Sequence, residues 1–306
     1  MIVREKPTAW ELFFVLRGSV ILRILPRIGA VAGLSLLVVL LHRRGWTQVP
    51  TIAPLGLSVI GAALAIFAAF RNSASYERWW DARKVAGLMV VEARSLSRQA
   101  RSYIAAVPGD QMSHRIALRC IAFIQIVRDC LRNRPIGENS APYLSSEEHA
   151  ALASSRGPAN FLLACFSADI AAAVAAGRLS PQMARTLEDR VVGLTLAFGV
   201  LERTKVTPMP FPYTLLIHRT AYMFCFLLPF GLADATGWWT PLLAAIISYA
   251  FFGLDAIADD LEAPFADAPM VVPLDAMARV VEISVLELLG EKDLPEPIRP
   301  KNFILT

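Results

Sequence analysis

The chain has 306 residues, of which 55% are hydrophobic and 18% carry a charge. Its mean hydropathy of +0.49 excludes an ordinary soluble protein and indicates several membrane-spanning segments. The 30 basic residues exceed the 26 acidic ones by a net charge of only +4. Basic residues at the ends of membrane helices account for this excess better than a nucleic-acid partner does, so we expect no nucleic-acid binding.

The four cysteines and the N-terminus narrow the class further. The cysteines show no C-x-x-C spacing and are too scattered for a disulfide framework, so we expect reduced thiols buried in the protein or the lipid. The N-terminal sequence carries acidic residues and no cleavage site after a short apolar core, so no signal peptide is predicted. Residues 1–19 mix aromatic and basic side chains, which predicts a short helix on the membrane surface.

The first predicted membrane span covers residues 20–41. Arg23, Pro26 and Arg27 interrupt its first half. We expect these two arginines to reach the cytoplasmic interface or to face protein, because a charge in contact with lipid is costly.

The second span leads into the longest predicted helix. No charged side chain occurs between Gly45 and Phe70, and after Pro54 the next proline is Pro108. One helix is therefore predicted to cross the membrane and continue beyond it, with a length of roughly 75 Å over most of this stretch. A cluster of basic residues after Phe70 places this end of the span in the cytoplasm, although two arginines in the outer loop argue weakly for the opposite orientation.

Residues 85–205 contain no uncharged run long enough to span a membrane, so they predict a helical cytoplasmic domain. Apolar residues at steps of three and four predict a helix over Met112–Arg132. Ser145 and Glu148 have the spacing of a capping box, and Ser180 followed by Pro181 predicts the start of another helix, which runs to about residue 205. Sustained alternation of apolar and polar residues is absent, so no strand is expected.

Two further spans are predicted over residues 213–233 and 235–254, after a non-helical segment with three prolines at residues 207–213. Four spans return both termini to the cytoplasm. A last amphipathic helix is expected over residues 273–289, followed by a tail that is loose or lies over a partner surface. The chain thus divides into an N-terminal section of two membrane helices (1–84), a cytoplasmic helical domain (85–206), a second membrane section (207–254) and a cytoplasmic C-terminal section (255–306).

Motifs of the common enzyme classes are absent. The sequence contains no G-x-S-x-G, no P-loop and no dinucleotide-binding glycine pattern, and its histidines lack metal-ligand spacing. We therefore predict neither an enzyme nor a bound cofactor. An acidic cluster ends the fourth span and consists of Asp255, Asp259, Asp260 and Glu262. It is interpreted either as a metal site or as a helix end that pairs with basic residues of the cytoplasmic domain or of a neighbouring subunit, and we favour the second because one helix face supplies few converging oxygens.

A stripe of apolar residues marks the second span. Ala62, Ile66 and Phe70 recur every four residues and therefore share one face of the helix. In a ring of identical helices this stripe would form stacked apolar constrictions that gate ions by dewetting. An ordinary stripe that faces lipid or protein has the same spacing, and on spacing alone it is the favoured interpretation.

Three segments resemble one known family in the same order along the chain. FRNSASYERWWDARK, PFPYTLLIHR and LDAIADDLEAPF are similar to segments of the bestrophins and their bacterial homologues, and the likeness runs from Trp10 to about Leu289. The resemblance implies an all-α membrane protein, namely a homopentameric ion channel with four membrane helices and a helical cytoplasmic domain in each subunit. It would lie in the inner membrane of a bacterial cell, with identical subunits, lipid and small monovalent ions as its partners.

The resemblance also implies residue roles. Alignment on the Arg78, Trp79 and Trp80 motif puts the hydrophobic neck of the family on Ala62, Ile66 and Phe70, with Ala62 smaller than the usual residue, so the outer ring is expected to be wider. A cytoplasmic aperture is expected near the start of the Pro181 helix, at Met183. Animal members carry an acidic calcium site after the Pro-Phe pair at 264 and 265. Here Asp267 is the only acid in the following segment, so the channel is predicted to be independent of calcium.

The sign of the permeating ion is left open by these residues. Animal members pass anions, and Arg71 would favour anions, whereas Glu77, Asp81 and Glu92 would favour cations if they faced the lumen. Helical periodicity from Phe70 puts Arg71 away from the lumen, which slightly favours cations, with a chloride channel as the alternative. A membrane-anchored scaffold or a carrier is the competing class, although no inverted repeat supports a carrier.

Overall fold

The structure is a computed structural model that describes residues 1–4, 8, 10, 11, 15, 18–45, 50–109, 111–266 and 268–306. These residues form helices and isolated backbone bridges, and no strand occurs among them. Residues 5–7, 9, 12–14, 16 and 17 of the predicted surface helix lie outside the described residues, as does Asp267. The chain divides into two compact units. We call residues 4–79 and 208–264 the membrane unit, and residues 1–3, 80–207 and 265–306 the helical unit.

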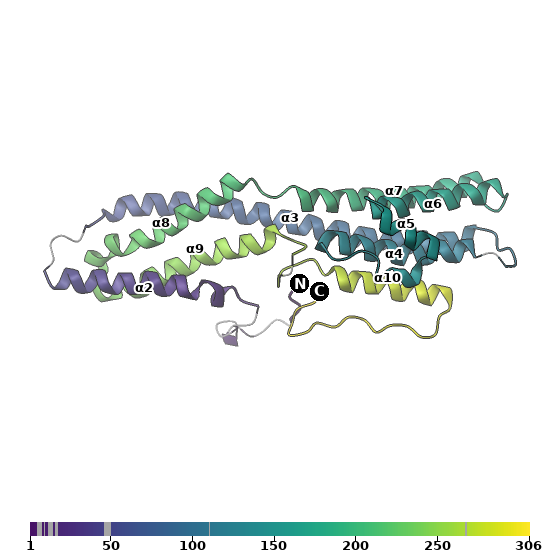
Figure 1. Ribbon diagram of the computed structural model, residues 1–306. Coiled ribbons are helices and arrows are strands. Elements are labelled where there is room, and N and C mark those ends of the chain that lie inside the picture. The colour runs from purple at the N-terminus through teal and green to yellow at the C-terminus, as the bar shows by residue number, and fades with distance from the viewer. Residues whose placement is uncertain are drawn as a thin grey trace. The chain divides into compact units, whose positions relative to one another are not determined.

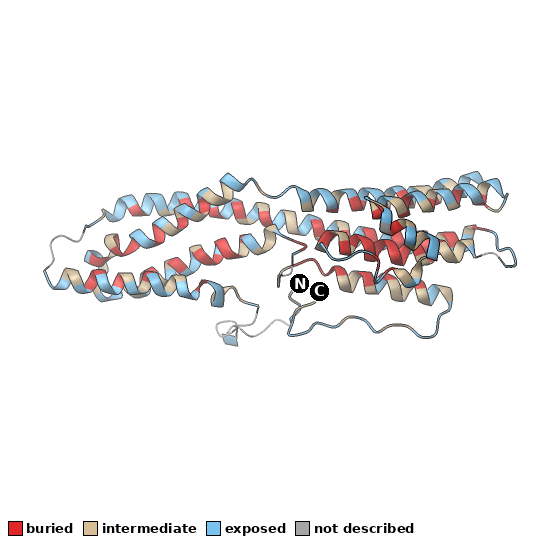
Figure 2. Cartoon of the chain, viewed as in Figure 1, coloured by how far each residue is buried: buried red, intermediate tan, exposed pale blue. Residues whose placement is uncertain are grey.

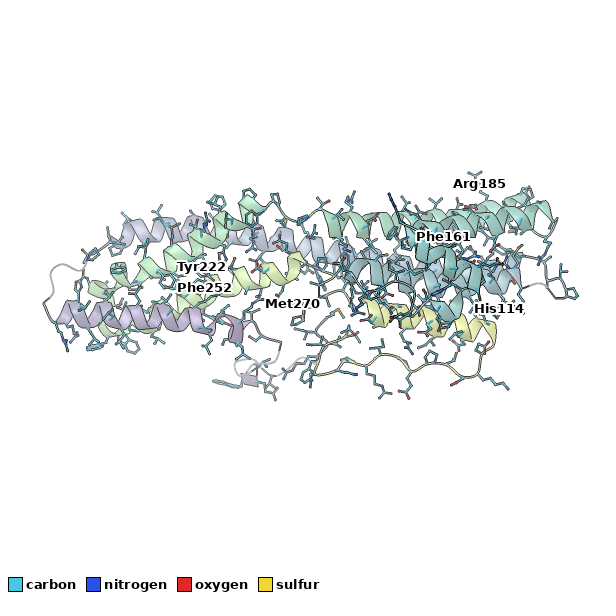
Figure 3. The ribbon with its side chains drawn as sticks, viewed as in Figure 1. His114, Phe161, Arg185, Tyr222, Phe252 and Met270 are labelled. Atoms are coloured by element: carbon cyan, nitrogen blue, oxygen red, sulfur yellow. The ribbon has the colours of Figure 1, made fainter. Side chains whose placement is uncertain are left out.

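The membrane unit is built from α2 (Ile21–Arg43), the first half of α3 (Pro54–Tyr103), α8 (Phe211–Thr236) and α9 (Thr240–Glu262) (Figure 1). Helices α2, α8 and α9 pack against one another around a core that includes Ile24, Phe224 and Phe252. Tyr222 of α8 and Phe252 of α9 face each other with their ring centroids 4.8 Å apart (Figure 3). The short 3-10 turn η2 (Gly237–Trp239) joins α8 to α9.

Helix α3 confirms the prediction of one uninterrupted helix. It contains 50 residues, begins at Pro54 and ends at Tyr103, shortly before Pro108. Helix α2 is likewise continuous through Pro26. Helix α9 continues past Leu254 to Glu262, so the acidic cluster lies in the membrane unit as the last turns of a membrane helix.

Among the described residues, four helical stretches are long and apolar enough to cross a membrane. They are α2, α3, α6 (Pro158–Ala175) and the Phe211–Glu262 stretch that contains α8, η2 and α9. Helix α6 was not predicted, because Asp169 interrupts its apolar run. In the structure Asp169 accepts hydrogen bonds from Arg115 and Arg119 of α4, and the side chains of Leu162 and Phe166 are buried. We therefore assign α6 to the core of the helical unit, which leaves the four predicted membrane helices.

The helical unit is organised around α4 (Met112–Arg132). Helices α6, α7 (Pro181–Val206) and α10 (Leu274–Leu289) pack against it, and the short η1 (Ala141–Tyr143) and α5 (Ser146–Ser154) complete the unit. Every residue of α4 from 116 to 127 except Leu118 is buried, as the red band in Figure 2 shows. The predicted apolar stripe is thus confirmed, but the helix is enclosed on nearly all sides.

Both predicted helix starts are confirmed by their hydrogen bonds. The Ser145 side chain accepts from the Glu148 N–H, and the Glu148 carboxylate accepts in return from the Ser145 N–H, which completes the capping box of α5. The Ser180 hydroxyl accepts from the Met183 N–H at the start of α7, with Pro181 in the first turn. These bonds satisfy N–H groups that a helix terminus otherwise leaves unpaired.

The C-terminal tail corrects one prediction. Its end pairs with the start of the same chain: the Leu305 N–H donates to the Met1 carbonyl and the Val3 N–H donates to the Phe303 carbonyl, each at 2.8 Å. The Ala276 N–H also donates to the Thr306 carbonyl at 2.8 Å. The expectation that this end of the tail is loose is therefore wrong, whereas the alternative that the tail lies over a partner surface stays a prediction. Backbone groups make this contact, so the side-chain pattern gave no signal of it.

Candidate pore-lining site

The predicted neck residues lie on the face of α3 that its own unit leaves uncovered. Ala62 is exposed, and the exposed fractions of Ile66 and Phe70 are 57% and 63%. The residues of α3 that are buried in the membrane unit recur at helical spacing on the other face; they are Leu57, Leu64, Ala68, Arg71 and Ser75. One face of this helix therefore packs within the subunit, and an apolar face remains for lipid, a neighbouring subunit or a lumen.

A glycine permits the close packing of the covered face. A Cβ atom added at Gly61 would lie 2.8 Å from Cζ of the Phe224 ring of α8. Real Cβ atoms do not approach another carbon so closely, so only glycine allows α8 to come this near to α3 at this level.

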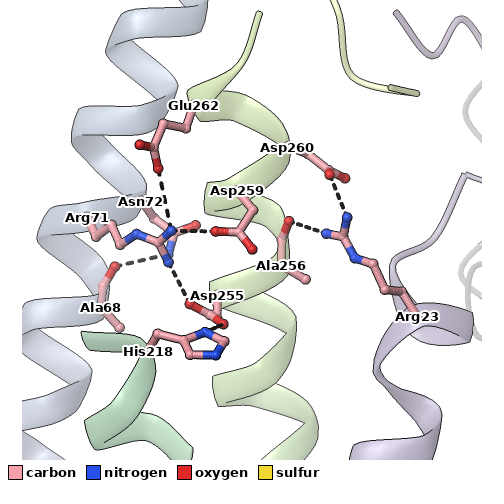
Figure 4. A network of polar contacts seen from close by, with 10 residues as sticks. All are labelled: Arg23, Ala68, Arg71, Asn72, His218, Asp255, Ala256, Asp259, Asp260 and Glu262. Carbon is pink, nitrogen blue, oxygen red and sulfur yellow. Dashed lines mark hydrogen bonds and ion pairs between the residues drawn. The ribbon is translucent and has the colours of Figure 1, made fainter. Parts of the chain in front are cut away.

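Arg71 sits directly after Phe70 and points the other way. Its side chain is 1% exposed. Its Nη1 donates to Asp255 Oδ1 at 2.6 Å and its Nη2 donates to Asp259 Oδ1 at 2.5 Å, while Glu262 Oε2 lies 3.5 Å from Nη2 (Figure 4). The guanidinium therefore faces α9 of its own chain, away from the exposed stripe.

The network continues to α8 and α2. The second oxygen of Asp255 lies 2.7 Å from Nδ1 of His218, whose ring is tilted by 38° against the Tyr222 ring with the ring centroids 4.3 Å apart. Arg23 of α2 donates to Asp260 Oδ1 at 2.8 Å and to the Ala256 carbonyl at 2.6 Å (Figure 4). Ion pairs and hydrogen bonds thus connect all four membrane helices at one level.

These contacts test the predictions for the two arginines of the first span and for the acidic cluster. Arg23 faces protein, which was one of the two expectations for it, and the guanidinium of Arg27 lies 5.4 Å from the centre of the Tyr222 ring. The acidic helix end pairs with basic residues, as favoured, but these residues lie in the first and second membrane helices of the same chain. Among the residues that the structure describes, no group of three or more His, Cys, Asp or Glu side chains could hold a metal ion.

Acidic residues further along α3 differ in their placement. Glu77 is exposed and follows Ile66 and Phe70 at helical spacing. Asp81 is exposed and pairs with Lys84 one turn later at 2.7 Å. Glu92 is buried and pairs with Arg190 of α7 at 3.0 Å, so it belongs to the core of the helical unit and does not meet the condition under which it would favour cations.

Met183 lies in the first turn of α7, in the helical unit. Its side chain is 43% exposed. Its backbone N–H is held by the Ser180 cap, so its place on this unit is fixed by the same bond that starts the helix.

Comparison with known proteins identifies the family. The model of the Bacterial/Fungal Bestrophin protein family matches residues 1–287, and the chain belongs to this family. It is 40% identical to a voltage-dependent anion channel-forming protein of Mesorhizobium japonicum, over 95% of this chain and 93% of that one. It is 35% identical to the voltage-dependent anion channel-forming protein YneE of Escherichia coli K12, over the full length of both.

The fold is similar to that of a solved member. The crystal structure of a bacterial bestrophin homologue from Klebsiella pneumoniae matches with a TM-score of 0.83 and 31% identity, over 88% of this chain and 100% of that one. The all-α fold with four apolar membrane helices is therefore the bestrophin fold.

Proposed function

We propose that the chain is the subunit of a homopentameric channel for small monovalent ions in the inner membrane of a bacterial cell, with both termini in the cytoplasm. The observation that carries the proposal is the match to channel-forming relatives over the whole chain. The uncovered apolar face of α3 supports it, because a pore built from identical subunits needs one helix face that its own subunit does not bury. A channel of this kind needs no catalytic group, and we propose that the protein is not an enzyme.

Ala62, Ile66 and Phe70 form the neck in this proposal. Five copies of each side chain would make three apolar rings, and an ion that passes them must shed or drag its hydration shell. The contacts of Arg71 support an orientation of α3 in which these three side chains face the lumen. Its buried ion pairs fix the rotation of α3 at the residue next to Phe70, so that the Phe70 ring is turned away from the core of its own subunit. Met183 forms the second constriction at the cytoplasmic end.

Cation selectivity is the first candidate for the ion sign. Arg71 is neutralised by α9, whereas Glu77 is exposed on the stripe below Phe70. Asp81 contributes less because Lys84 partly neutralises it. Chloride selectivity is the second candidate, and the name of the channel-forming relatives favours it. We further propose that calcium does not gate the channel, since residues 266–273, where animal members carry an acidic run, contain Asp267 as their single acid.

The test is a planar bilayer that contains the purified protein under a steep NaCl gradient. Unitary currents are expected, with a reversal potential close to the equilibrium potential of sodium. In Glu77→Gln this reversal potential should move toward zero. A reversal potential near the equilibrium potential of chloride would show that the channel selects anions. The absence of any current would favour a scaffold or a carrier.

The neck is tested separately in the same bilayer. Ile66→Ala and Phe70→Ala are expected to raise conductance or open probability, because smaller side chains widen the apolar rings and let them stay wet. Leu64→Ala is the matched control from the buried face. Currents that Ile66→Ala and Phe70→Ala leave unchanged contradict the neck assignment.

A further inference from the structure

A cavity of about 320 Å³ lies in the helical unit between the second half of α3 and α10. Helix α3 contributes Val91, Arg94, Ser95, Ser97 and Arg98, and helix α10 contributes Ser284, Val285 and Leu288. The polar lining consists of arginines and serines, and no carboxylate is among the described residues that line it. The cavity is separate from the neck and from the ion pairs of the membrane unit.

The two arginines of this cavity are unusual in their surroundings. Arg94 and Arg98 are one helical turn apart, both are exposed, and neither guanidinium takes part in a hydrogen bond or ion pair with the residues that the structure describes. The next arginine on α3, Arg101, donates to the Ser113 hydroxyl at 3.3 Å. Two like charges four residues apart destabilise a helix, so an anion between them would relieve a repulsion that the chain itself leaves uncompensated.

The other walls of the cavity divide into hydroxyl and apolar parts. Ser95 and Ser284 are half-buried, and their hydroxyls have no hydrogen bond with other described residues, so both remain available as donors. Ser97 is buried and already donates to the Ala93 carbonyl at 2.8 Å. The apolar lining consists of the buried Val285 and the exposed Val91 and Leu288.

We propose that this cavity binds a small organic phosphate, with Arg94 and Arg98 on the phosphate oxygens and the valine and leucine side chains against the organic part. A phosphate monoester carries up to two negative charges and three terminal oxygens, which match two guanidiniums and two hydroxyls. A carboxylate has one charge and two oxygens, so it would leave donors unused. A volume of about 320 Å³ lies at the lower end of the range for ligand pockets, which suits a compact ligand.

The proposal uses only residues of the helical unit and does not depend on ion conduction. The competing occupant of the same arginines is an acidic segment from a second copy of the chain. That occupant would compete with a small phosphate and would prevent saturable binding in the assembled protein.

The test is isothermal titration of the full chain, purified in detergent at constant NaCl concentration, with phenyl phosphate and with inorganic phosphate as probes. We expect phenyl phosphate to bind saturably and more tightly than inorganic phosphate. Arg94→Gln together with Arg98→Gln should weaken binding of phenyl phosphate at least 10-fold, and Ser284→Ala should weaken it by a smaller factor. The charge-matched control is Arg185→Gln with Arg203→Gln, which removes two exposed guanidiniums of α7 outside the cavity (Figure 3 labels Arg185).

Three results would overturn the proposal. The first is the absence of saturable binding to the unaltered protein, which is also the result expected if an acidic segment of another copy fills the site. The second is an equal loss of binding in the Arg94/Arg98 variant and in the control, which would mean that net charge alone attracts the probe. The third is inorganic phosphate binding as tightly as phenyl phosphate, because the apolar wall would then contribute nothing.

Discussion

The two units of this protein both bury arginines, but with opposite balances of charge. In the membrane unit the single guanidinium of Arg71 faces the carboxylates of Asp255, Asp259 and Glu262. In the helical unit the guanidiniums of Arg128, Arg132 and Arg134 converge on Asp275, with Asp129 as a further acid beside Arg128. In the membrane unit one base thus serves three acids, whereas in the helical unit one acid, Asp275, serves three bases. Because removing one partner of a buried pair leaves a charge uncompensated, the residue whose loss matters most should differ between the units.

The largest effect is expected at Arg71. Arg71→Met leaves three carboxylates without their cation and should destabilise the protein by about 3–5 kcal/mol, seen as a large fall in melting temperature in detergent. Asp255→Asn is the matched variant, and it should have a clearly smaller effect because Asp259 and Glu262 still face Arg71. Equal falls in melting temperature for the two variants would contradict the charge balance described for this unit.

The helical unit should show the reverse order. Asp275→Asn leaves three arginines around a neutral group and is expected to destabilise by roughly 1.5–3 kcal/mol, because the carboxylate is only partly buried. Arg134→Gln should have little effect, since its side chain is 40% exposed and two other arginines still contact Asp275. The measurement is the melting temperature of both variants. A larger fall for Arg134→Gln than for Asp275→Asn would contradict the charge balance described for the helical unit.

A packing test separates charge from shape in the membrane unit. Gly61→Ala places a methyl group against the Phe224 ring and is expected to destabilise by about 1–3 kcal/mol, because the buried ring must shift to make room for it. Gly56→Ala on the same helix meets nothing within 4 Å and should leave the melting temperature unchanged or raise it slightly. Similar results at both glycines would mean that α8 does not need this close approach.

The smallest effect concerns acid in the helical unit. Burial opposes the charge of Glu148, but hydrogen bonds from the Ser145 N–H and from Arg119 outweigh it and hold the pKa of Glu148 below its ordinary value. A carboxylate with a lowered pKa contributes stability above its unfolded-state pKa and loses it as the pH falls through the folded-state pKa. Glu148→Gln should therefore flatten the loss of melting temperature below about pH 4.5, the region around the unfolded-state pKa of Glu. An unchanged pH profile would remove Glu148 from the acid response.

Local signals predicted the elements of this fold better than its contacts. The absence of proline between residues 54 and 108 predicted helix α3, and a serine with its partner three residues later predicted the start of α5. Helix α6 was missed because Asp169 looks like a break in an apolar run until its arginine partners on α4 are known. The exposed apolar stripe of α3 was predicted from its four-residue spacing, whereas the buried ion pairs of Arg71 were not, because its partner Asp255 lies 184 residues away. The tail contact was missed because backbone groups make it.

The separation of Arg71 from Asp255 along the chain also matters for biogenesis. The second membrane helix is synthesised 184 residues before its counter-charge, a delay of roughly 10–40 s at ordinary rates of translation. During this time the arginine is in the nascent chain without its carboxylates. The last membrane helix must then pack against the earlier helices, with Asp255, Asp259 and Glu262 turned toward the Arg71 guanidinium. The membrane unit is therefore completed only when its final helix, α9, has been made.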